Sequence, residues 1–235
     1  MIGIVAKNGA KGEVSMTRGF AIAHEAGEIV KFINSVSEKT NGSVARTDGN
    51  DIKEQIGIAA VVARDMSNGN ILAYNGSSML GKSSNGTPVI EIKPGVVADE
   101  FVGRTINGDS KAILADSIRE KYPQAVLISV KSEAELRKGK AESLKEMGFV
   151  SDREADTVEN YRNSVLMREL NVSERFWDNV SAKASGGNIW IGIQTKETYD
   201  DRDIFSANKQ QAADMKEMRR DSCEFNSIHS RSCLP

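Results

Sequence analysis

A proline–glycine pair interrupts the longest β-type run of this chain, and this feature constrains the fold more than any other. Residues 89–97 would form one apolar strand, but Pro94 and Gly95 stand inside it. Proline cannot donate a hydrogen bond to a ladder and glycine tolerates a positive φ, so the pair predicts a bulge in mid-strand. A bulge bends its strand away from a neighbour, which limits the sheets that can contain this segment.

Two β-type runs precede the interrupted strand, at residues 58–63 and 70–74. The dipeptide Asn68-Gly69 between them is the strongest short-range signal for a hairpin. A second turn-rich stretch at 81–86 leads into the interrupted strand. Because short turns join the successive strands, the sequence predicts an antiparallel meander.

The first fifty residues show weaker patterns. Short strands are expected at 2–6 and 13–16. Apolar residues recur at helical spacing over 20–38, which predicts a helix. The stretch 40–50 is rich in Gly, Asn, Thr and Ser, and we expect it to be a loop.

The segment that follows the interrupted strand has the layout of an anion site. Its loop carries Gly103, Arg104, Asn107 and Gly108, and a helix is expected over 110–121. Backbone N–H groups at a helix N-terminus bind anions, and nearby basic side chains add to the attraction. The loop and the start of the helix are therefore a candidate phosphate-binding segment.

Further elements continue the α/β pattern. The short, almost wholly apolar run at 125–130 is typical of a strand buried on both faces, and a strand–helix–strand unit of this length predicts a parallel crossover. Later elements are expected in the following order: helix 133–147, helix 157–170, helix 173–184 capped by Ser173, strand 187–194 and helix 206–220. We expect a core at 1–150, an extension at 151–220 that continues the domain, and a loose tail at 221–235.

In this order of elements and in three short segments, the chain resembles the Gcn5-related N-acetyltransferase family. Residues 96–104 are similar to the end of that family's fourth strand, 108–114 to its pyrophosphate loop and helix start, and 141–149 to its last core helix, which runs into Gly-Phe. The resemblance covers about residues 20–150. It implies an α/β fold with a mixed, strongly twisted sheet whose central strands splay apart, as in acyl-CoA N-acyltransferases, with a C-terminal extension.

The resemblance also implies an enzyme that transfers an acyl group, expected to be acetyl, from a coenzyme A thioester to an amine. The backbone of Val96 and Val97 would bind the pantetheine arm and polarise the thioester carbonyl. The residues expected to bind acetyl-coenzyme A as co-substrate are Val96, Val97, Arg104, Asn107, Gly108, Asp109, Ser110 and Lys111.

Glu91 is the candidate catalytic base, because relatives often keep a base on the strand before the bulge. A glutamate among Val89, Ile90 and Ile92 would have a raised pKa if its face were covered. The alternative is a polar residue of an alternating strand that faces water. Asp99 and Glu100 are the next candidates.

The chain also departs from the family's pattern. Three residues separate Arg104 from Gly108 where the family has two, and Ser110 stands where a second small residue belongs. Asp109 places a carboxylate beside the expected anion, and Leu144 stands where many members carry an acid tyrosine. Two alternatives therefore stay open: an inactive binding or assembly module with this fold, and a viral structural protein.

Net charge and the length of the apolar runs limit the classes of partner that the chain can bind. The formal net charge is -2, and no apolar run reaches the ~18 residues that a membrane span needs, so we expect neither a general nucleic-acid binder nor a membrane protein. A cytoplasmic protein is expected, with a small amine, a protein or a modified base as acceptor and a homodimer left open. His24 is either a substrate contact or a packing residue. Cys223, His229 and Cys233 lack an evident fourth ligand, so no metal site is predicted.

Overall fold

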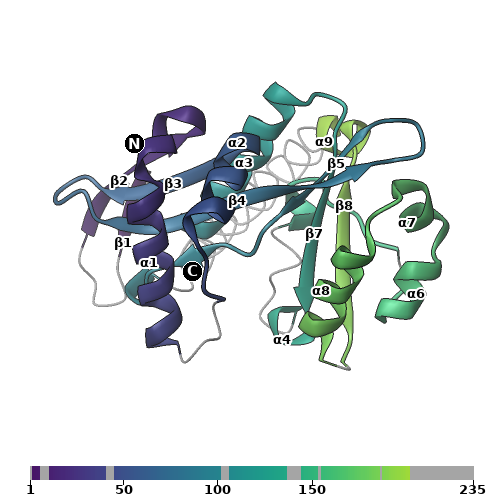
Figure 1. Cartoon of the computed structure of the whole chain (residues 1–235). Helices are drawn as coiled ribbons and strands as arrows, with labels where there is room; N and C mark the ends of the chain where they lie inside the picture. Colours follow the sequence, from purple (N-terminus) through teal and green to yellow (C-terminus); the bar gives the residue numbers. More distant parts are fainter. Residues whose placement is uncertain are drawn as a thin grey trace, which may run out of the picture.

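The computed structural model describes residues 2–5, 11–40, 45–101, 106–136, 144–152, 155–185 and 187–201. Their strands form one mixed sheet in the order β1-β2-β3-β4-β5-β7-β8 (Figure 1), and β6 pairs with β4 at residues 73 and 74, next to the part of β4 that pairs with β5. The strands are β1 (Ile2–Val5), β2 (Lys11–Arg18), β3 (Ala60–Asp65), β4 (Ile71–Lys82), β5 (Pro88–Ile92), β6 (Val96–Val97), β7 (Val126–Ser132) and β8 (Ile189–Gln194).

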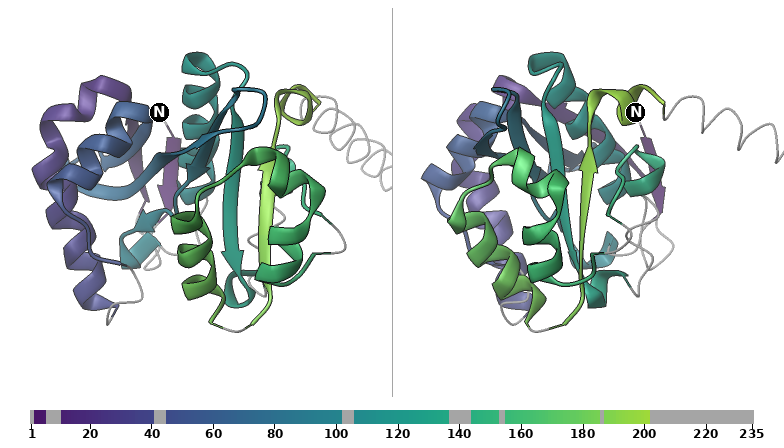
Figure 2. Two further views of the ribbon diagram at one scale, coloured as in Figure 1. Left: turned by 45° about the vertical axis from the view of Figure 1, so that its right-hand side comes forward. Right: turned by 90° about the vertical axis from the view of Figure 1, so that its right-hand side faces the viewer.

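Helices cover both faces of this sheet. They are η1 (Gly19–Glu25), α1 (Ala26–Lys39), α2 (Gly49–Ile58), η2 (Asp99–Phe101), α3 (Ile106–Lys121), α4 (Glu133–Leu136), α6 (Val158–Asn163), α7 (Val165–Leu170), α8 (Glu174–Ala184) and α9 (Lys196–Asp200). On one face, α1 and α2 pack over β3 and β4, while α6, α7 and α8 pack over β5, β7 and β8 (Figure 2). The opposite face is covered by α3.

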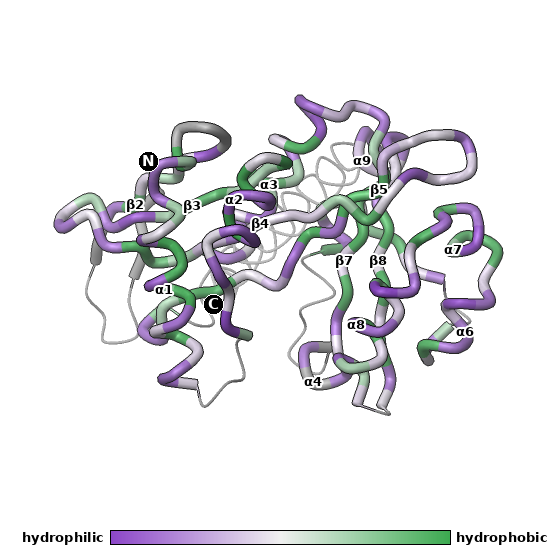
Figure 3. The backbone as a smooth tube through the Cα atoms, viewed as in Figure 1, coloured by the Kyte–Doolittle hydropathy of each residue, from purple (hydrophilic) through white to green (hydrophobic). Residues whose placement is uncertain are grey.

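The predicted meander and crossover are both confirmed. The strands β3, β4 and β5 pair antiparallel in succession. After α3 the chain returns to β7, which pairs parallel with β5. The strands β7 and β8 are hydrophobic along most of their length (Figure 3), as expected for strands buried on both faces.

The predicted bulge is confirmed by the register of the sheet. Ile92 lies opposite Ser77 on β4, and Val96 lies opposite Tyr74. Three residues of the bulged strand therefore face two residues of β4, and this extra residue defines a β-bulge. The glycine of the pair, Gly95, does not have a positive φ.

Several boundaries differ from the predictions, and three of these differences have a direct physical reason. Helix α2 occupies part of the expected loop, because Asp48 accepts hydrogen bonds from the amides of the first turn and Ile52 and Ile56 are buried. Helix α3 starts at Ile106, before the expected residue 110, since Ile106 is fully buried. The expected helix 157–170 is two helices, because Ser164 has an extended backbone and caps α7.

The segment after residue 151 shares its core with the central strands. Strand β8 lies between β7 and Val150, which forms a bridge with Ile193. Tyr161, Phe176 and Trp177 pack against β5, β7 and β8. The expected helix 206–220 and tail 221–235 lie outside the described residues. No helix in the described part of the chain is long and apolar enough to span a bilayer.

Candidate functional site

Two central strands separate just before the bulge. Strand β7 pairs with β5 only through Val126–Ile128, and then continues to Ser132 beside β8 alone. Within the described residues, β6 pairs only with β4. The edges of β6 and of the second half of β7 therefore face each other without a ladder between them, and Figure 1 shows the two strand pairs diverging.

The pairing of β6 decides which backbone amides face this gap. The amide of Ala98 donates to the carbonyl of Leu72 at 2.8 Å. Because N–H groups alternate in direction along an antiparallel strand, the amide of Val96 points to β4 and that of Val97 points away from it. On the other side of the bulge, the Lys93 amide donates to β4 at Gly76, 3.0 Å away. Val97 is therefore the expected cofactor residue whose amide faces the gap.

The N-terminus of α3 supplies a second set of free amides. The N–H groups of the cap residue and of the first three residues of an α-helix have no partner inside the helix, and among the described residues of α3 these belong to Ile106, Asn107 and Gly108. The amides of Asp109, Ser110 and Lys111 lie further in, where they join the helical ladder. The side chains of Ser110 and Lys111 are buried, and the Ser110 hydroxyl donates to the Ile106 carbonyl at 2.7 Å. Arg104 lies outside the described residues.

A fixed carboxamide connects β4 to α3 beneath the bulge. Asn75 is fully buried, and its Nδ2 donates to Ser110 Oγ at 2.6 Å. Ser110 uses its own proton on the Ile106 carbonyl, so it must accept from Asn75, and this fixes which end of the amide faces it. The Oδ1 of Asn75 consequently faces the opposite way, toward Gly95.

Two oxygens without hydrogen-bond partners meet at Gly95. A Cβ on this glycine would lie 2.2 Å from Asn75 Oδ1 and 2.1 Å from Asn107 Oδ1. Both oxygens are buried, and neither accepts a hydrogen bond within the described structure. Since a buried polar group left unpaired costs about 1–3 kcal/mol, a pair of them at one place calls for a physical reason. The glycine at this position provides space for the two carboxamides.

Glu91 lies on the opposite face of the sheet from these carboxamides. Its side chain is only 14% exposed, and its Oε2 lies 2.6 Å from Lys93 Nζ. Ser78 is directly across the ladder from Glu91, and its hydroxyl is buried without a partner in the described structure. The candidate base is therefore mostly enclosed and ion-paired, in contrast to a residue that faces open water.

Near Glu91, the same face carries a tyrosine and a glutamine. Tyr74 is buried and donates its hydroxyl to Gln55 Oε1 at 3.2 Å. Burial raises the pKa of the Tyr74 phenol. A Cβ on Gly76 would lie 2.0 Å from Gln55 Oε1, so this glycine makes room for the amide of α2.

The remaining candidate residues lie in the core, at the surface or outside the described part of the chain. Leu144 is 1% exposed and packs with α3 and the sheet. The position compared above with an acid tyrosine is therefore held by a core leucine in this chain. Asp99 and Glu100 are exposed on η2. Cys223, His229 and Cys233 lie outside the described residues, and the described ones contain no group of His, Cys, Asp and Glu that could hold a metal ion.

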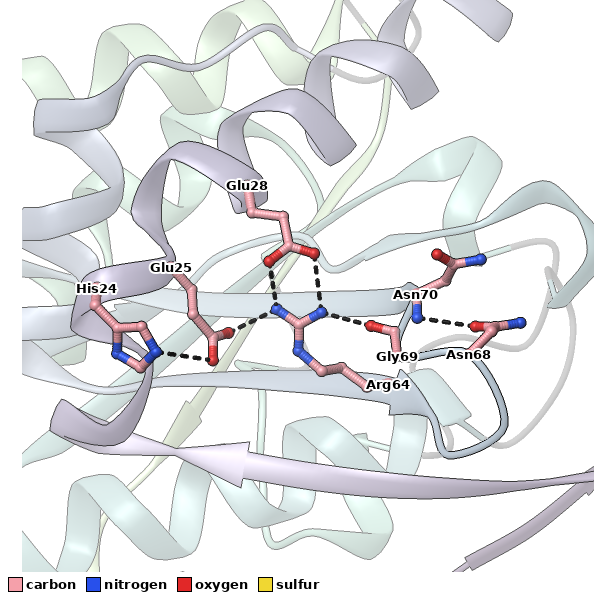
Figure 4. A network of polar contacts seen from close by, with 7 residues as sticks. All are labelled: His24, Glu25, Glu28, Arg64, Asn68, Gly69 and Asn70. Atoms are coloured by element: carbon pink, nitrogen blue, oxygen red, sulfur yellow. Dashed lines mark hydrogen bonds and ion pairs between the residues drawn. The ribbon is translucent and has the colours of Figure 1, made fainter.

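His24 stands at the end of a network that fastens α1 to the β3–β4 turn (Figure 4). Arg64 donates to both carboxylate oxygens of Glu28 at 3.0 and 2.9 Å, to Glu25 at 2.7 Å and to the Gly69 carbonyl at 2.6 Å. The His24 side chain is 79% exposed and lies 3.7 Å from Glu25. His24 is therefore a surface residue that lies beside the ion pairs of Arg64 with Glu25 and Glu28.

A groove of about 650 Å³ lies between α1, the β3–β4 turn and the segment from Val97 to Phe101. Its lining includes Phe32 and Leu72, and its charged residues are both acidic and basic. The charged residues are Glu28, Lys31, Lys39, Asp65, Asp99 and Glu100. A wall of mixed sign does not favour a polyanion such as nucleic acid.

Comparison with known proteins identifies the fold. No family model and no curated protein matches this sequence. Among solved structures, the NatC complex bound to a Gag peptide and CoA matches with a TM-score of 0.51 at 11% identity, over 78% of this chain and 98% of that one. Arabidopsis thaliana Naa50 in complex with the bisubstrate analogue CoA-Ac-MVNAL matches with a TM-score of 0.50 at 14% identity, over 77% and 98%. The chain therefore has the mixed α/β fold of the Gcn5-related N-acetyltransferases, in a divergent form.

Proposed function

We propose that this protein transfers an acyl group, acetyl in the simplest case, from a coenzyme A thioester to an amine. One observation carries the proposal: the bulge separates β6 from β7 and turns the Val97 amide into the gap between them. The two similar structures support it, since one is a complex with CoA and a peptide and the other is a complex with a bisubstrate analogue that contains CoA.

The residues present fit coenzyme A. The free amides of Asn107 and Gly108 suit a pyrophosphate at a helix N-terminus. A Cβ added to Gly108 would meet nothing within 4 Å, so the backbone there is open to a ligand.

In this proposal the protein contributes orientation, charge stabilisation and a base. When bound, coenzyme A supplies the acyl group as a thioester and leaves as a thiolate. The Val97 N–H donates to the carbonyl oxygen as negative charge develops there, which lowers the barrier. The Glu91 carboxylate accepts the proton that the attacking amine loses, after Lys93 moves from it. The proposed acceptor is an amine on a small molecule, a protein or a modified base.

A thermal-shift titration tests donor binding. A ligand at 100 times its Kd stabilises the folded state by about 2.7 kcal/mol, so acetyl-coenzyme A should raise the melting temperature by several degrees. No stabilisation at millimolar acetyl-coenzyme A would refute the proposal. Stabilisation without thiol release against any panel of amines, N-terminal peptides and nucleosides would favour the inactive binding module, which also agrees with the core position of Leu144.

The role of the Val97 amide has its own test. Val97→Pro removes the N–H that faces the gap without removing a hydrogen bond to β4, whereas Val97→Ala keeps the amide and shortens the side chain. We expect thiol release to fall about 10²–10³-fold in Val97→Pro, with coenzyme A binding retained and Val97→Ala close to wild type. Equal activities in the two variants would remove this amide from the mechanism.

Glu91→Gln tests the base. The substitution keeps the shape and a hydrogen-bond acceptor near Lys93 but removes the proton acceptor, so turnover should fall by about 10²–10⁴-fold. Lys93→Met is the matched variant, because it removes the ion pair and leaves the carboxylate. Unchanged turnover in Glu91→Gln would assign the proton to another group.

A further inference from the structure

Asn75 and Asn107 keep a costly arrangement that packing does not require. Each has a buried Oδ1 without a partner in the described structure, and both oxygens face the same glycine. Neither Pro94, which has no N–H, nor the Lys93 amide, which is bonded to β4, donates to these oxygens. An apolar residue of similar shape would avoid this cost at either position.

The two carboxamides differ in their freedom to move. Asn75 is held through its Nδ2 by Ser110, and that hydroxyl is held by the Ile106 carbonyl. Asn107 lies in the first turn of α3, is partly exposed, and makes no side-chain hydrogen bond to another described residue. Rotation of Asn107 about its side-chain bonds would therefore turn its oxygen from Gly95 toward the gap.

Carboxamide oxygens only accept hydrogen bonds, so they suit a ligand that presents N–H groups and they oppose a phosphate. We propose that Asn107 rotates and accepts a hydrogen bond from a secondary amide N–H group of the donor's pantetheine arm, while Asn75 stays fixed beneath Gly95. Asn107 thereby favours donors that contain such an amide, apart from the nucleotide end held at the N-terminus of α3. This inference rests on the proposed use of coenzyme A and adds one side chain that contacts the pantetheine arm.

The experiment compares two probes on each variant by isothermal titration calorimetry. Coenzyme A contains the amides of the pantetheine arm, whereas 3′-phospho-ADP contains its nucleotide half and no amide. Asn107→Leu fills the space without an acceptor, and Asn107→Ala empties it. Both variants should bind coenzyme A about tenfold more weakly, as expected for one lost hydrogen bond, and should bind 3′-phospho-ADP like the wild type.

A second readout distinguishes a ligand role from a structural one. Asn107→Leu should melt at or above the wild-type temperature, since it removes an unpaired buried oxygen, even while it weakens coenzyme A binding. Asn163→Leu on α6 is the matched control, because this asparagine is exposed and lies on a different helix, and it should change neither affinity.

The outcomes separate this inference from the proposed function. If the wild-type protein binds neither probe, the proposed function fails. If it binds both and the Asn107 variants keep the wild-type ratio of the two affinities, or lose both affinities equally, Asn107 does not contact the amide and this inference alone is overturned. A loss in Asn107→Leu without one in Asn107→Ala would indicate obstruction by the larger side chain and would also overturn it.

Discussion

Gly95→Ala is the sharpest perturbation of the bulge. The new Cβ would lie 2.1 and 2.2 Å from two carboxamide oxygens, below the closest contacts that real Cβ atoms make. Asn75 cannot give way easily, because Ser110 holds its Nδ2 at 2.6 Å. The φ of Gly95 is not positive, so alanine is not excluded by the backbone and the whole cost comes from these contacts.

The expected magnitude follows from overpacking. Forcing an extra methyl into a packed site costs about 1–3 kcal/mol, and a domain of 150–250 residues loses roughly 2–4 °C of melting temperature per kcal/mol. We therefore expect Gly95→Ala to melt roughly 2–12 °C below wild type when unfolding is followed by circular dichroism.

Gly108→Ala is the matched control for this prediction. It lies in the first turns of α3, where a Cβ would meet nothing within 4 Å, and alanine is the better helix former by about 1 kcal/mol. Gly108→Ala should therefore be as stable as wild type or more so. A Gly95→Ala protein with wild-type stability would show that the carboxamides are free to move, and would refute the argument that Ser110 fixes Asn75.

Three further variants test the framework around the site. Arg119→Met should lower the free energy of unfolding by at least about 2 kcal/mol in urea, because it strips a donor from the buried Gln194 carbonyl, and a smaller loss would mean that water replaces the guanidinium. The hydrogen bond from Arg64 holds the pKa of Glu28 below its usual 4.5, so this carboxylate stabilises the fold above that pH and the gain is lost as pH falls. Glu28→Gln should accordingly lose stability at neutral pH and show a shallower loss on acidification, and parallel profiles would contradict this. Ser173→Ala removes the cap of α8 and should cost about 1 kcal/mol in the same urea assay, so no change would show that the cap is dispensable.

The bulge could be predicted from the sequence because its signal is local. A proline and a glycine inside an apolar run break the ladder wherever the run is placed. The cap of α8 was predictable for the same reason, since Ser173 precedes an amphipathic stretch. Helix α2 also carried local signals, a capping Asp48 and the buried pair Ile52 and Ile56, but they lay beside a polar stretch that favoured a loop.

The contacts that build the site had no such local signal. Asn75 and Ser110 are separated by 35 positions and meet only because the crossover places α3 under β4. The sequence predicts the start of α3 four residues late, because the burial of Ile106 depends on the sheet beneath it. Glu91 was predictable as a candidate from its place before the bulge, and its enclosure and ion pair with Lys93 follow from the packed neighbours of β5.

Two glycines make room for polar side chains where the ladder of the sheet is broken. Gly76 on β4 admits the side chain of Gln55 from α2, and Gly95 on the bulge admits the carboxamides of Asn75 and Asn107 from the opposite face. Polar groups therefore reach the backbone from both sides at the point where β6 and β7 separate. Apolar clusters under α1 and α2, under α3, and under α6 to α8 hold the strands on either side of that point. These clusters hold the strands without help from the polar groups. Replacing one apolar side chain in a cluster by a slightly smaller one should therefore lower the stability of the fold while leaving the distance between β6 and β7 unchanged.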